Sequence, residues 1–357
     1  MTSRITLAIA VAAAAFAAAP ASADYYENRE ITLLVGFTPG GGTDRFARLI
    51  ADHLGRHVDG NPTVTVRNMP GAGSVLASNY FVSPRTARDG ETLMVGTGQL
   101  LMRIMLGLEG SVAALDDYHP LFAGPQGRMT FARSDMGIEQ PADIVDGTRE
   151  FIHGSAGILA SIDTLLGMEV LGVDVTVITG YPGKAETLLA FERGEVNLDG
   201  QTTGNIQDRV IPLIEEGAAV SLFTQGYVDD FGDLVRDPTM PDFASIRDVY
   251  VEIFGEEPSG PAWTSYLAMT AATVNLGRVI KAHRDTPQEA IDALNTAFER
   301  LENDPDFLAD AAVQMAGYRA YGGEPLVGAV EAAIGMSAED LEWIREFLST
   351  KHGVNFN

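Results

Sequence analysis

Short β-rich runs that alternate with helical stretches constrain the fold of this chain more than any other sequence feature. The apolar run Ile31–Phe37 ends at a Pro-Gly turn, and Thr43–Leu54 then carries apolar residues at helical spacing. Two further β-rich runs, Thr63–Arg67 and Thr92–Val95, flank a helical stretch over Gly71–Phe81. A strand–helix–strand rhythm of this kind predicts a mainly parallel sheet covered by helices.

The same rhythm returns in the middle of the chain. Strand candidates are the runs Met129–Ala132, Glu150–His153, Val173–Ile178, Val196–Leu198 and Ala219–Thr224. Helical patterns lie between or after them, over Ile158–Leu171, Lys184–Arg193 and Asn205–Glu216. Two sheets of similar size predict two α/β domains, and 357 residues are enough for two separate cores.

The carboxyl third reads as mostly helical. Thr286-Pro287-Gln288-Glu289 predicts a capping box with proline at the first helical position, and Ser337 begins the last helix in a similar way. No low-complexity linker separates the two α/β regions, so we expect a hinge between them.

Residues 1–23 have the three parts of a secretory signal. Arg4 precedes the apolar run Ile5–Ala19, and small residues follow up to Ala23. The run is too short for a transmembrane helix, and no later stretch is long enough. We expect cleavage after Ala23 and a mature protein outside the cytoplasm that begins at Asp24.

Charge and cysteine content exclude several functions. The chain carries 24 Lys and Arg against 49 Asp and Glu, a net charge of -25, and has no cysteine. Nucleic-acid binding and attraction to an anionic membrane both require a basic face. The lack of cysteine excludes disulfides, thiolate zinc sites, iron–sulfur clusters and cysteine nucleophiles. We therefore expect no nucleic-acid partner.

The glycine-rich segment after the first strand is the strongest local signal for binding. The first amides of a helix have no partner inside the helix, and its dipole places positive charge there. Glycines let a ligand approach that backbone, so the segment predicts an anion cradle. It matches neither a phosphate-binding Walker loop nor a dinucleotide fingerprint, and a simple capped turn is the alternative. The candidate residues are Phe37, Thr38, Pro39, Gly40, Gly41, Gly42, Thr43 and Asp44.

Glycine-rich turns recur at other strand ends. They contain Thr97-Gly98-Gln99, Ser155-Ala156-Gly157 and Tyr181. Each turn alone predicts only a connection. In open α/β sheets, however, ligands sit beyond the carboxyl ends of the strands. Two domains with such turns could close on a small anion between them.

The sequence matches known catalytic motifs only in part. His153-Gly154-Ser155-Ala156-Gly157 approaches a nucleophile elbow, but His153 stands where that motif has its first glycine. His53 and His57 have a metal-like spacing without the accompanying glutamate. We expect no catalytic residue, no metal site and no cofactor, and we keep a secreted hydrolase using Ser155 as a rival hypothesis.

Several motifs together resemble the substrate-binding proteins of tripartite tricarboxylate transporters, the Bug family. They are the segment Phe37–Asp44, Asn68-Met69-Pro70-Gly71-Ala72-Gly73, Asp89-Gly90-Glu91-Thr92-Leu93, Gly96-Thr97, Gly154-Ser155-Ala156-Gly157, Tyr181-Pro182-Gly183-Lys184-Ala185, Gly194-Glu195-Val196-Asn197, Thr286-Pro287 and Asp304-Pro305. The resemblance spans nearly the whole mature chain. It implies a type II periplasmic binding protein: two doubly wound α/β domains, a hinge and a ligand cleft between them.

The resemblance also implies where the cleft lies. Phe37–Thr43 and Thr97–Gln99 would line one side, and Ser155, Ala156, Gly157 and Tyr181 the other. Crossings near Gly124–Pro125 and Gln225–Gly226 would give one domain of residues 24–124 plus 226–357 and a second of residues 125–225.

The chain departs from the family pattern at three positions. Met69 stands where many relatives have Arg, and Gln201 followed by Thr202 stands where relatives often have Asp. We include Gln201 and Thr202 among the candidate ligand residues. Arg45 adds a cation at a helix start, as either a solvated side chain or a group facing the ligand.

The function implied is that of a monomeric extracytoplasmic receptor without catalytic activity. It would capture a small organic carboxylate and deliver it to membrane permease subunits. Phe37 and Tyr181 would suit an aromatic ligand. A periplasmic sensor that signals to a membrane kinase is the alternative.

Overall fold

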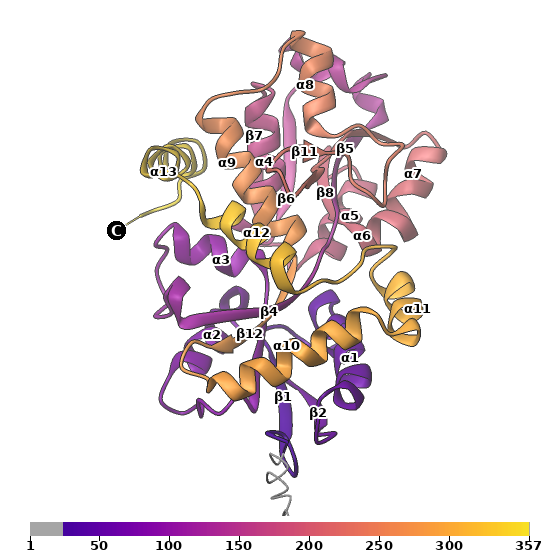
Figure 1. Cartoon of the computed structure of the whole chain (residues 1–357). Helices are drawn as coiled ribbons and strands as arrows, with labels where there is room; N and C mark the ends of the chain where they lie inside the picture. Colours follow the sequence, from indigo (N-terminus) through magenta and orange to yellow (C-terminus); the bar gives the residue numbers. More distant parts are fainter. Residues whose placement is uncertain (1–23, 357) are drawn as a thin grey trace, which may run out of the picture.

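The computed structural model describes residues 24–356, so the predicted signal peptide lies outside the described residues. Two five-stranded sheets stand one above the other in Figure 1. The first sheet has the order β2-β1-β3-β12-β4, with β1 (Glu30–Val35), β2 (Thr63–Asn68), β3 (Thr92–Gly96), β4 (Tyr118–Gly124) and β12 (Arg278–His283). The second has the order β7-β6-β8-β5-β9, with β5 (Arg128–Arg133), β6 (Phe151–Ser155), β7 (Val175–Thr179), β8 (Leu198–Thr202) and β9 (Ala219–Thr224).

The expectation of mainly parallel sheets is wrong, because two of the four strand pairings in each sheet are antiparallel. β1 pairs in parallel with β2 and β3, as β6 does with β7 and β8. The strand β12 runs antiparallel to both of its neighbours, and so does β5. Each of these two strands follows a crossing from the other sheet, and each enters its own sheet in the reverse direction.

Helices cover both faces of the first sheet. On one face, Phe46 and Ile50 of α1 pack with Leu294 and Phe298 of α10, and Phe122 of β4 stacks on Phe298 with ring centroids 4.7 Å apart. The other face carries α2, α3 and α12. We call this sheet with its helices the first lobe. Its helices are α1 (Gly42–Leu54), α2 (Val75–Val82), α3 (Gly98–Met105), α10 (Gln288–Glu302), α11 (Pro305–Gln314) and α12 (Gly323–Ile334).

The second sheet is covered in the same way and forms the second lobe. Leu188 and Phe191 of α5 pack on Met129 and Phe131 of β5, and the opposite face holds α4, α8 and α9. Its helices are α4 (Ile162–Val170), α5 (Lys184–Glu192), α6 (Thr203–Asn205), α7 (Ile211–Glu215), α8 (Ile246–Phe254) and α9 (Pro261–Thr270). The last helix, α13 (Ala338–His352), lies against α9 at the side of the molecule (Figure 1). A small hairpin joins β10 (Tyr227–Val228) and β11 (Leu234–Val235).

The segments that join the lobes are bonded to one another. The backbone N–H of Gln126 donates to the carbonyl of Val274 at 2.9 Å, between the β4–β5 connection and the π-helix Ala271–Asn275 that precedes β12. Neither β4 nor β12 was predicted from the sequence; β12 was missed because the carboxyl third reads as mostly helical.

Helix starts agree only in part with the capping predictions. Ser337 caps α13, and its side chain accepts from the backbone N–H of Asp340. The capping box predicted at Thr286 is wrong, because Pro287 is the cap residue of α10 and no side chain caps that helix.

Candidate functional site

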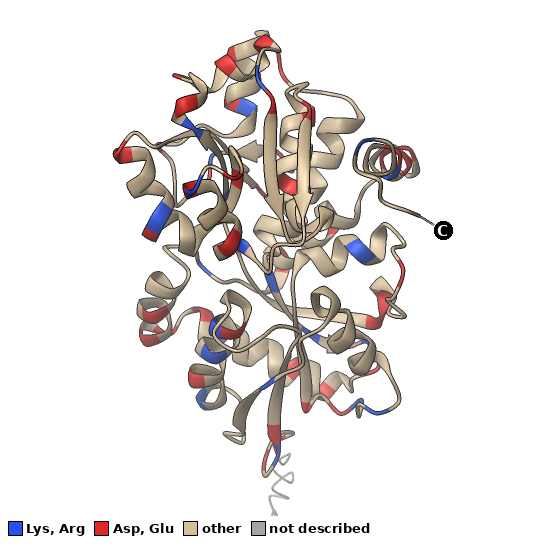
Figure 2. Cartoon of the chain, turned by 180° about the vertical axis from the view of Figure 1, so that it is seen from behind, with Lys and Arg blue, Asp and Glu red and all other residues tan. Residues whose placement is uncertain are grey.

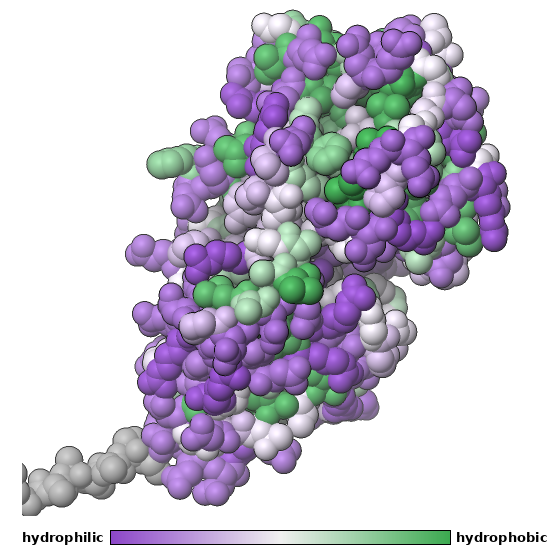
Figure 3. Space-filling view, turned by 90° about the vertical axis from the view of Figure 1, so that its right-hand side faces the viewer, coloured by the Kyte–Doolittle hydropathy of each residue, from purple (hydrophilic) through white to green (hydrophobic). Residues whose placement is uncertain are grey.

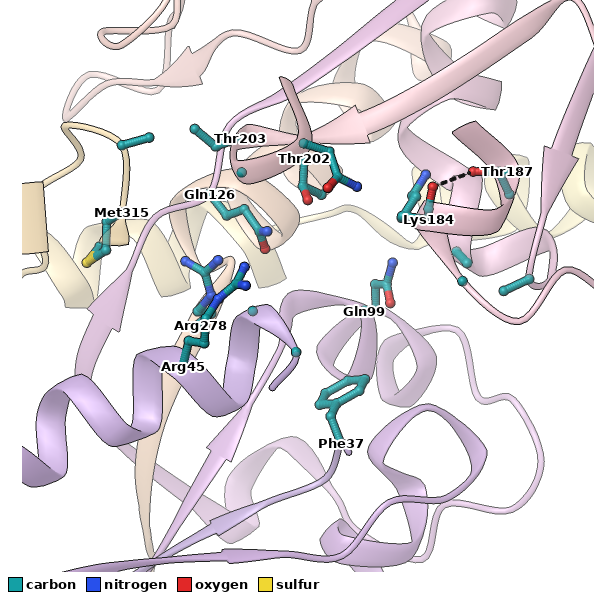
Figure 4. Close-up of a pocket in the computed structure, with 18 of the residues that line it drawn as sticks. Phe37, Arg45, Gln99, Gln126, Lys184, Thr187, Thr202, Thr203, Arg278 and Met315 are labelled. Carbon is teal, nitrogen blue, oxygen red and sulfur yellow. Dashed lines mark hydrogen bonds between the residues drawn. The ribbon is translucent and has the colours of Figure 1, made fainter. Parts of the chain in front are cut away.

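A cavity of about 470 Å³ lies between the two lobes. Figure 3 shows two lobes with a notch between them on one side, and Figure 4 shows the cavity itself. We call it the cleft. Its lining residues from the first lobe and the crossings are Phe37, Gly41, Gly42, Arg45, Gln99, Pro125, Gln126, Arg278, Gln314, Met315 and Ala316. Those from the second lobe are Ser155, Ala156, Ala160, Pro182, Gly183, Lys184, Thr187, Thr202, Thr203, Gly204 and Asn205.

Helix starts from both lobes meet at the cleft. Gly41 is the cap residue of α1 and Gly183 is the cap residue of α5, and neither helix has a side-chain cap. The helix α3 begins at Gly98, also without a side-chain cap, and its Gln99 reaches the cleft. Backbone amides at such starts are available to an anion, and the helix dipole favours it there.

Asp44 fixes the shape of the glycine-rich loop. Its carboxylate accepts from the backbone N–H of Gly40 at 2.7 Å, from Arg48 at 2.9 and 3.1 Å, and from Nδ2 of Asn68 at 2.9 Å. Asn68 Nδ2 also donates to the carbonyl of Phe37 at 3.0 Å, which ties both ends of the loop to β2. Burial raises the pKa of Asp44, but these hydrogen bonds outweigh burial and lower it to about 2.

The structure brings seven of the seventeen predicted ligand residues to the cleft. They are Phe37, Gly41, Gly42, Gln99, Ser155, Ala156 and Thr202. The other ten do not line it: Thr38, Pro39, Gly40, Thr43, Asp44, Thr97, Gly98, Gly157, Tyr181 and Gln201.

The structure explains why several of these ten residues do not line the cleft. Thr38, Pro39 and Gly40 are exposed, and Tyr181 packs over Gly154, so Pro182 lines the cleft instead. The amide of Gln201 is buried, where it donates to Asp199 at 2.6 Å and to the carbonyl of Lys184 at 2.8 Å.

Arg278, at the start of β12, is a buried cation at the floor of the cleft. It is 7% exposed, its Nε has no hydrogen-bond partner, and it pairs with no carboxylate in the described part of the chain. One weak hydrogen bond joins Nη1 to the carbonyl of Pro125 at 3.4 Å, and the guanidinium lies 5.8 Å from the ring centre of Phe46. Burial, together with the charges of Arg45 and Arg128, lowers the pKa of Arg278 to about 10.

Arg45 lies beside Arg278 in Figure 4, on the first turn of α1. Lys184, the first residue of α5, stands at the opposite end of the cleft from these two arginines. Its ammonium donates to the carbonyl of Gly200 at 2.5 Å. Among the residues 24–356, three cations line the cleft and no Asp or Glu does, although acids outnumber bases in the chain and occur on the outside of both lobes (Figure 2).

Most of the polar floor of the cleft was not predicted from the sequence. Arg278 and Gln126 belong to the crossings, where the sequence showed no motif for binding. For Arg45, both a solvated side chain and a group facing the ligand were considered. Three lining residues, Thr203, Gly204 and Asn205, directly follow the predicted pair Gln201-Thr202. The prediction therefore lay at the right loop but began one residue too early and ended three residues too soon.

The rival hydrolase hypothesis finds no suitable geometry. Among the described residues, His153 makes no hydrogen bond to Ser155: its Nε2 lies 2.7 Å from Oγ of Ser161, and Ser161 donates to Oγ of Ser155 at 2.6 Å. Ser155 itself donates to the carbonyl of Gly157 at 2.7 Å. Burial lowers the pKa of His153 to about 4. Ser161 is fully buried, so this chain of hydrogen bonds holds the loop after β6.

The described residues contain no cluster of three or more His, Cys, Asp or Glu side chains suited to a metal ion. Within the same residues, no helix is long and apolar enough to cross a membrane.

No family model matches the chain. A UPF0065 protein encoded in the gbd 5′ region of Cupriavidus necator is 43% identical over 275 residues, which cover 72% of this chain and 76% of that protein. In Bordetella pertussis, a UPF0065 protein is 30% identical over 213 residues and BugT is 38% identical over 106 residues. These two matches cover 57% and 29% of this chain, and 63% and 31% of the relatives.

Solved structures share the fold. The periplasmic binding protein BugD aligns with a TM-score of 0.62 at 20% identity, over 90% of this chain and 98% of its own. A TctC solute-binding protein from Polaromonas gives 0.64 at 18% identity, over 90% and 99%. MatC from Rhodopseudomonas palustris with bound malate gives 0.59 at 21% identity, over 88% and 97%. The chain therefore belongs to the UPF0065 family, the Bug family of tripartite tricarboxylate transporter binding proteins that its motifs resemble.

Proposed function

We propose that this protein is an extracytoplasmic receptor that captures a small organic carboxylate in the cleft and delivers it to the permease of a tripartite tricarboxylate-type transporter. The observation that carries the proposal is Arg278, a buried guanidinium at the floor of the cleft that pairs with no carboxylate among residues 24–356. A buried charge without a partner is costly, so a ligand anion would supply what the chain does not.

Local charge in the cleft outweighs the acidic character of the whole chain. A net charge of -25 repels an anion at long range, but salt screens that field within about 8 Å. Each hydrogen bond to a charged group contributes about 1.5–3 kcal/mol. Two arginines, Lys184 and the helix starts can together provide several such bonds. The binding of malate by a protein of the same fold, MatC, supports a carboxylate as the ligand class.

Both lobes contribute polar groups, which supports capture by closure. We propose crossings near Gly124–Pro125 and Gln225–Gly226 as the hinge, with a first domain of residues 24–124 plus 226–357 and a second of residues 125–225. Pro125 and Gln126 lie both at a crossing and in the cleft, so closure would move the walls around a nearly fixed floor. The seventeen ligand residues predicted from the sequence remain a proposal, to which the structure adds Arg45, Gln126, Lys184 and Arg278.

Export completes the proposed role. We propose that residues 1–23 are removed after Ala23, so that a monomeric receptor acts in the periplasm without a cofactor. The periplasmic binding proteins that share its fold support this location.

A thermal-shift screen over mono-, di- and tricarboxylates, amino acids and aromatic acids tests the proposal. A ligand at 100 times its dissociation constant should add about 2.7 kcal/mol to the free energy of unfolding. Matched neutral amides of the active acids serve as controls and should give no shift. If every carboxylate leaves the melting temperature unchanged, the proposal is wrong.

Experiments separate the proposed receptor from its two rivals, of which the hydrolase already lacks a hydrogen bond between His153 and Ser155 within the described part of the chain. A sensor for a membrane kinase would use the same cleft, so deletion of the partner permease genes or kinase genes distinguishes uptake from signalling. A hydrolase using Ser155 would lose turnover of an ester substrate in Ser155→Ala, whereas a receptor has no turnover to lose.

A further inference from the structure

Lys281 is a second buried cation that the cleft does not use. It lies on β12, is 8% exposed, and faces the side of the first sheet opposite α1 and α10. Its ammonium lies 4.3 Å from the ring centre of Tyr118. Within residues 24–356 it forms no ion pair with a carboxylate. The neighbouring strand provides space for this side chain, because a Cβ on Gly96 would lie 3.0 Å from Nζ.

The side chain of Lys281 lines a cavity of about 90 Å³ between the first sheet, α3 and α12. The walls are mostly apolar and include Leu101 and Ile104 of α3 and Val330 and Ile334 of α12. Ile334 is 39% exposed, which places an apolar wall of the cavity at the protein surface. None of the residues that line this cavity comes from the second lobe, so the cavity does not depend on closure of the cleft.

A second polar atom in this cavity also lacks a partner. Thr97 is the cap residue of α3, yet its side chain does not cap the helix, and its buried Oγ1 makes no hydrogen bond with any part of the chain that the structure describes. Thr97 and Lys281 both line the cavity, at the start of a helix whose dipole favours an anion. Among the described residues, this mostly apolar cavity is lined by one ammonium without a carboxylate and one hydroxyl without a hydrogen bond, which is the pattern of a site for an amphipathic acid.

The charge of Lys281 determines what such a ligand must carry. Burial alone lowers the pKa of Lys281 to about 8, so at neutral pH most molecules still hold a buried ammonium. A cation–ring contact compensates only part of the cost of removing that charge from water. A carboxylate would supply the missing counter-charge and accept a hydrogen bond from the hydroxyl of Thr97.

We propose that the cavity at Lys281 is a second ligand site, separate from the cleft, that binds a small monocarboxylate with an apolar tail. The carboxylate pairs with Nζ of Lys281 and Oγ1 of Thr97. The tail lies between α3 and α12, against Leu101, Ile104, Val330 and Ile334. The size of the cavity restricts the ligand to a short chain, and a second charged group on the tail would be buried without a partner.

Isothermal titration calorimetry with hexanoate tests the site in the mature chain. Hexanoate binding should persist in Arg278→Gln, in which the cleft has lost its buried cation, and the further substitution Lys281→Met in that background should weaken it at least tenfold. The neutral analogue 1-hexanol should bind at least tenfold more weakly than hexanoate to the wild type. Lys351→Met, at an exposed lysine, is the matched control and should bind like the wild type. Melting temperatures of all variants establish that they fold.

Lysine NMR gives an independent reading, because the chain has only three lysines, Lys184, Lys281 and Lys351. With 13Cε-labelled lysine, the signal that is lost in Lys281→Met should shift when hexanoate is added, and its titration should move to higher pH. The other two signals should not change. The proposal is overturned if the wild type does not bind hexanoate, if Lys281→Met in the Arg278→Gln background binds it equally well, if Arg278→Gln abolishes binding, or if the Lys281 signal is unaffected.

Discussion

Arg278 and Arg45 place two guanidinium groups side by side at the floor of the cleft, and no Asp or Glu of residues 24–356 lines that cavity. The two side chains come from elements far apart in the sequence, since Arg45 is on α1 and Arg278 begins β12. A Cβ on Gly42 would lie 3.3 Å from Nη2 of Arg278, so the glycine-rich loop and the buried arginine meet at one point. The two like charges repel one another, and a bound anion would relieve that repulsion.

Arg278→Gln should abolish most ligand binding while leaving the fold intact. The substitution removes a charge that no carboxylate in the described residues pairs, so we expect the unliganded protein to be as stable as the wild type or more so. Loss of one or two hydrogen bonds to a charged group should weaken binding by about 10- to 100-fold. Calorimetry with the acid that gives the largest shift in the thermal screen measures this.

Arg236 offers a matched control for that substitution. Its side chain is about half exposed and pairs with Asp248 on the surface. Because an exposed ion pair contributes little, Arg236→Gln should change neither binding nor stability appreciably. Equal ligand affinity in Arg278→Gln and Arg236→Gln would remove the central support for the proposed function.

Arg45→Gln should have a smaller effect than Arg278→Gln. Arg45 is exposed, so solvent screens its interaction with a ligand, and contributions of exposed pairs are about 0.2–1 kcal/mol. We expect a loss of affinity of about two- to fivefold. The two arginines affect one another, so the double variant should lose less affinity than the sum of the two single losses. Calorimetry on the four-member cycle checks this, and strict additivity would show that the arginines bind independently.

Asp44 should make stability depend on pH. Its folded pKa of about 2 lies below the ordinary value of 3.8, so the ionised carboxylate stabilises the folded state above about pH 4, and this contribution is lost as pH falls toward 2. At about 1.4 kcal/mol per pKa unit, the contribution is roughly 2 kcal/mol for this buried side chain. Asp44→Asn should therefore be destabilised at pH 7, and its difference from the wild type should shrink below pH 4.

Urea unfolding at pH 7, 4 and 2.5 measures that difference. Asp52→Asn, an exposed position on the same helix, is the control and should follow the wild type at each pH. A constant difference between Asp44→Asn and the wild type across this range would show that the carboxylate contributes through its shape and not its charge.

The sequence predicts the parts of this fold whose local pattern agrees with their environment. The strand β9 and the ends of β1 to within two residues follow from runs of apolar and β-branched residues. The strand β12, Arg278-Val279-Ile280-Lys281-Ala282-His283, is buried throughout, yet three of its six residues are polar. A strand with buried charges does not resemble a core strand, and for that reason β12 could not be predicted from its local sequence. Two cations of this strand carry the two proposed sites: Arg278 lies in the cleft between the lobes, and Lys281 lies in the cavity of the first lobe.

The glycine-rich turns illustrate a second limit. Local sequence predicts that a glycine is needed, but it does not reveal whether a ligand or another segment of backbone approaches it. Gly41 and Gly42 border the cleft, whereas Gly98 is in contact with the π-helix before β12. Both patterns look alike in the sequence, because the approaching partner is determined by tertiary structure.

Gly98→Ala should severely destabilise the protein. A Cβ at this position would lie 1.6 Å from the carbonyl oxygen of Ala272 and 2.3 Å from its carbon, and backbone atoms cannot move aside as the end of a side chain can. We expect a loss of about 3 kcal/mol or more in the free energy of unfolding, at the upper end of what overpacking costs. Gly157, another turn glycine, is the matched control: it has an extended φ of 171° and nothing within 4 Å of an added Cβ. Gly157→Ala should change stability by less than about 0.5 kcal/mol. Urea denaturation of both variants measures the two free energies of unfolding. Similar stabilities would contradict a role for Gly98 in the close packing of α3, and its backbone would then be accessible to a ligand.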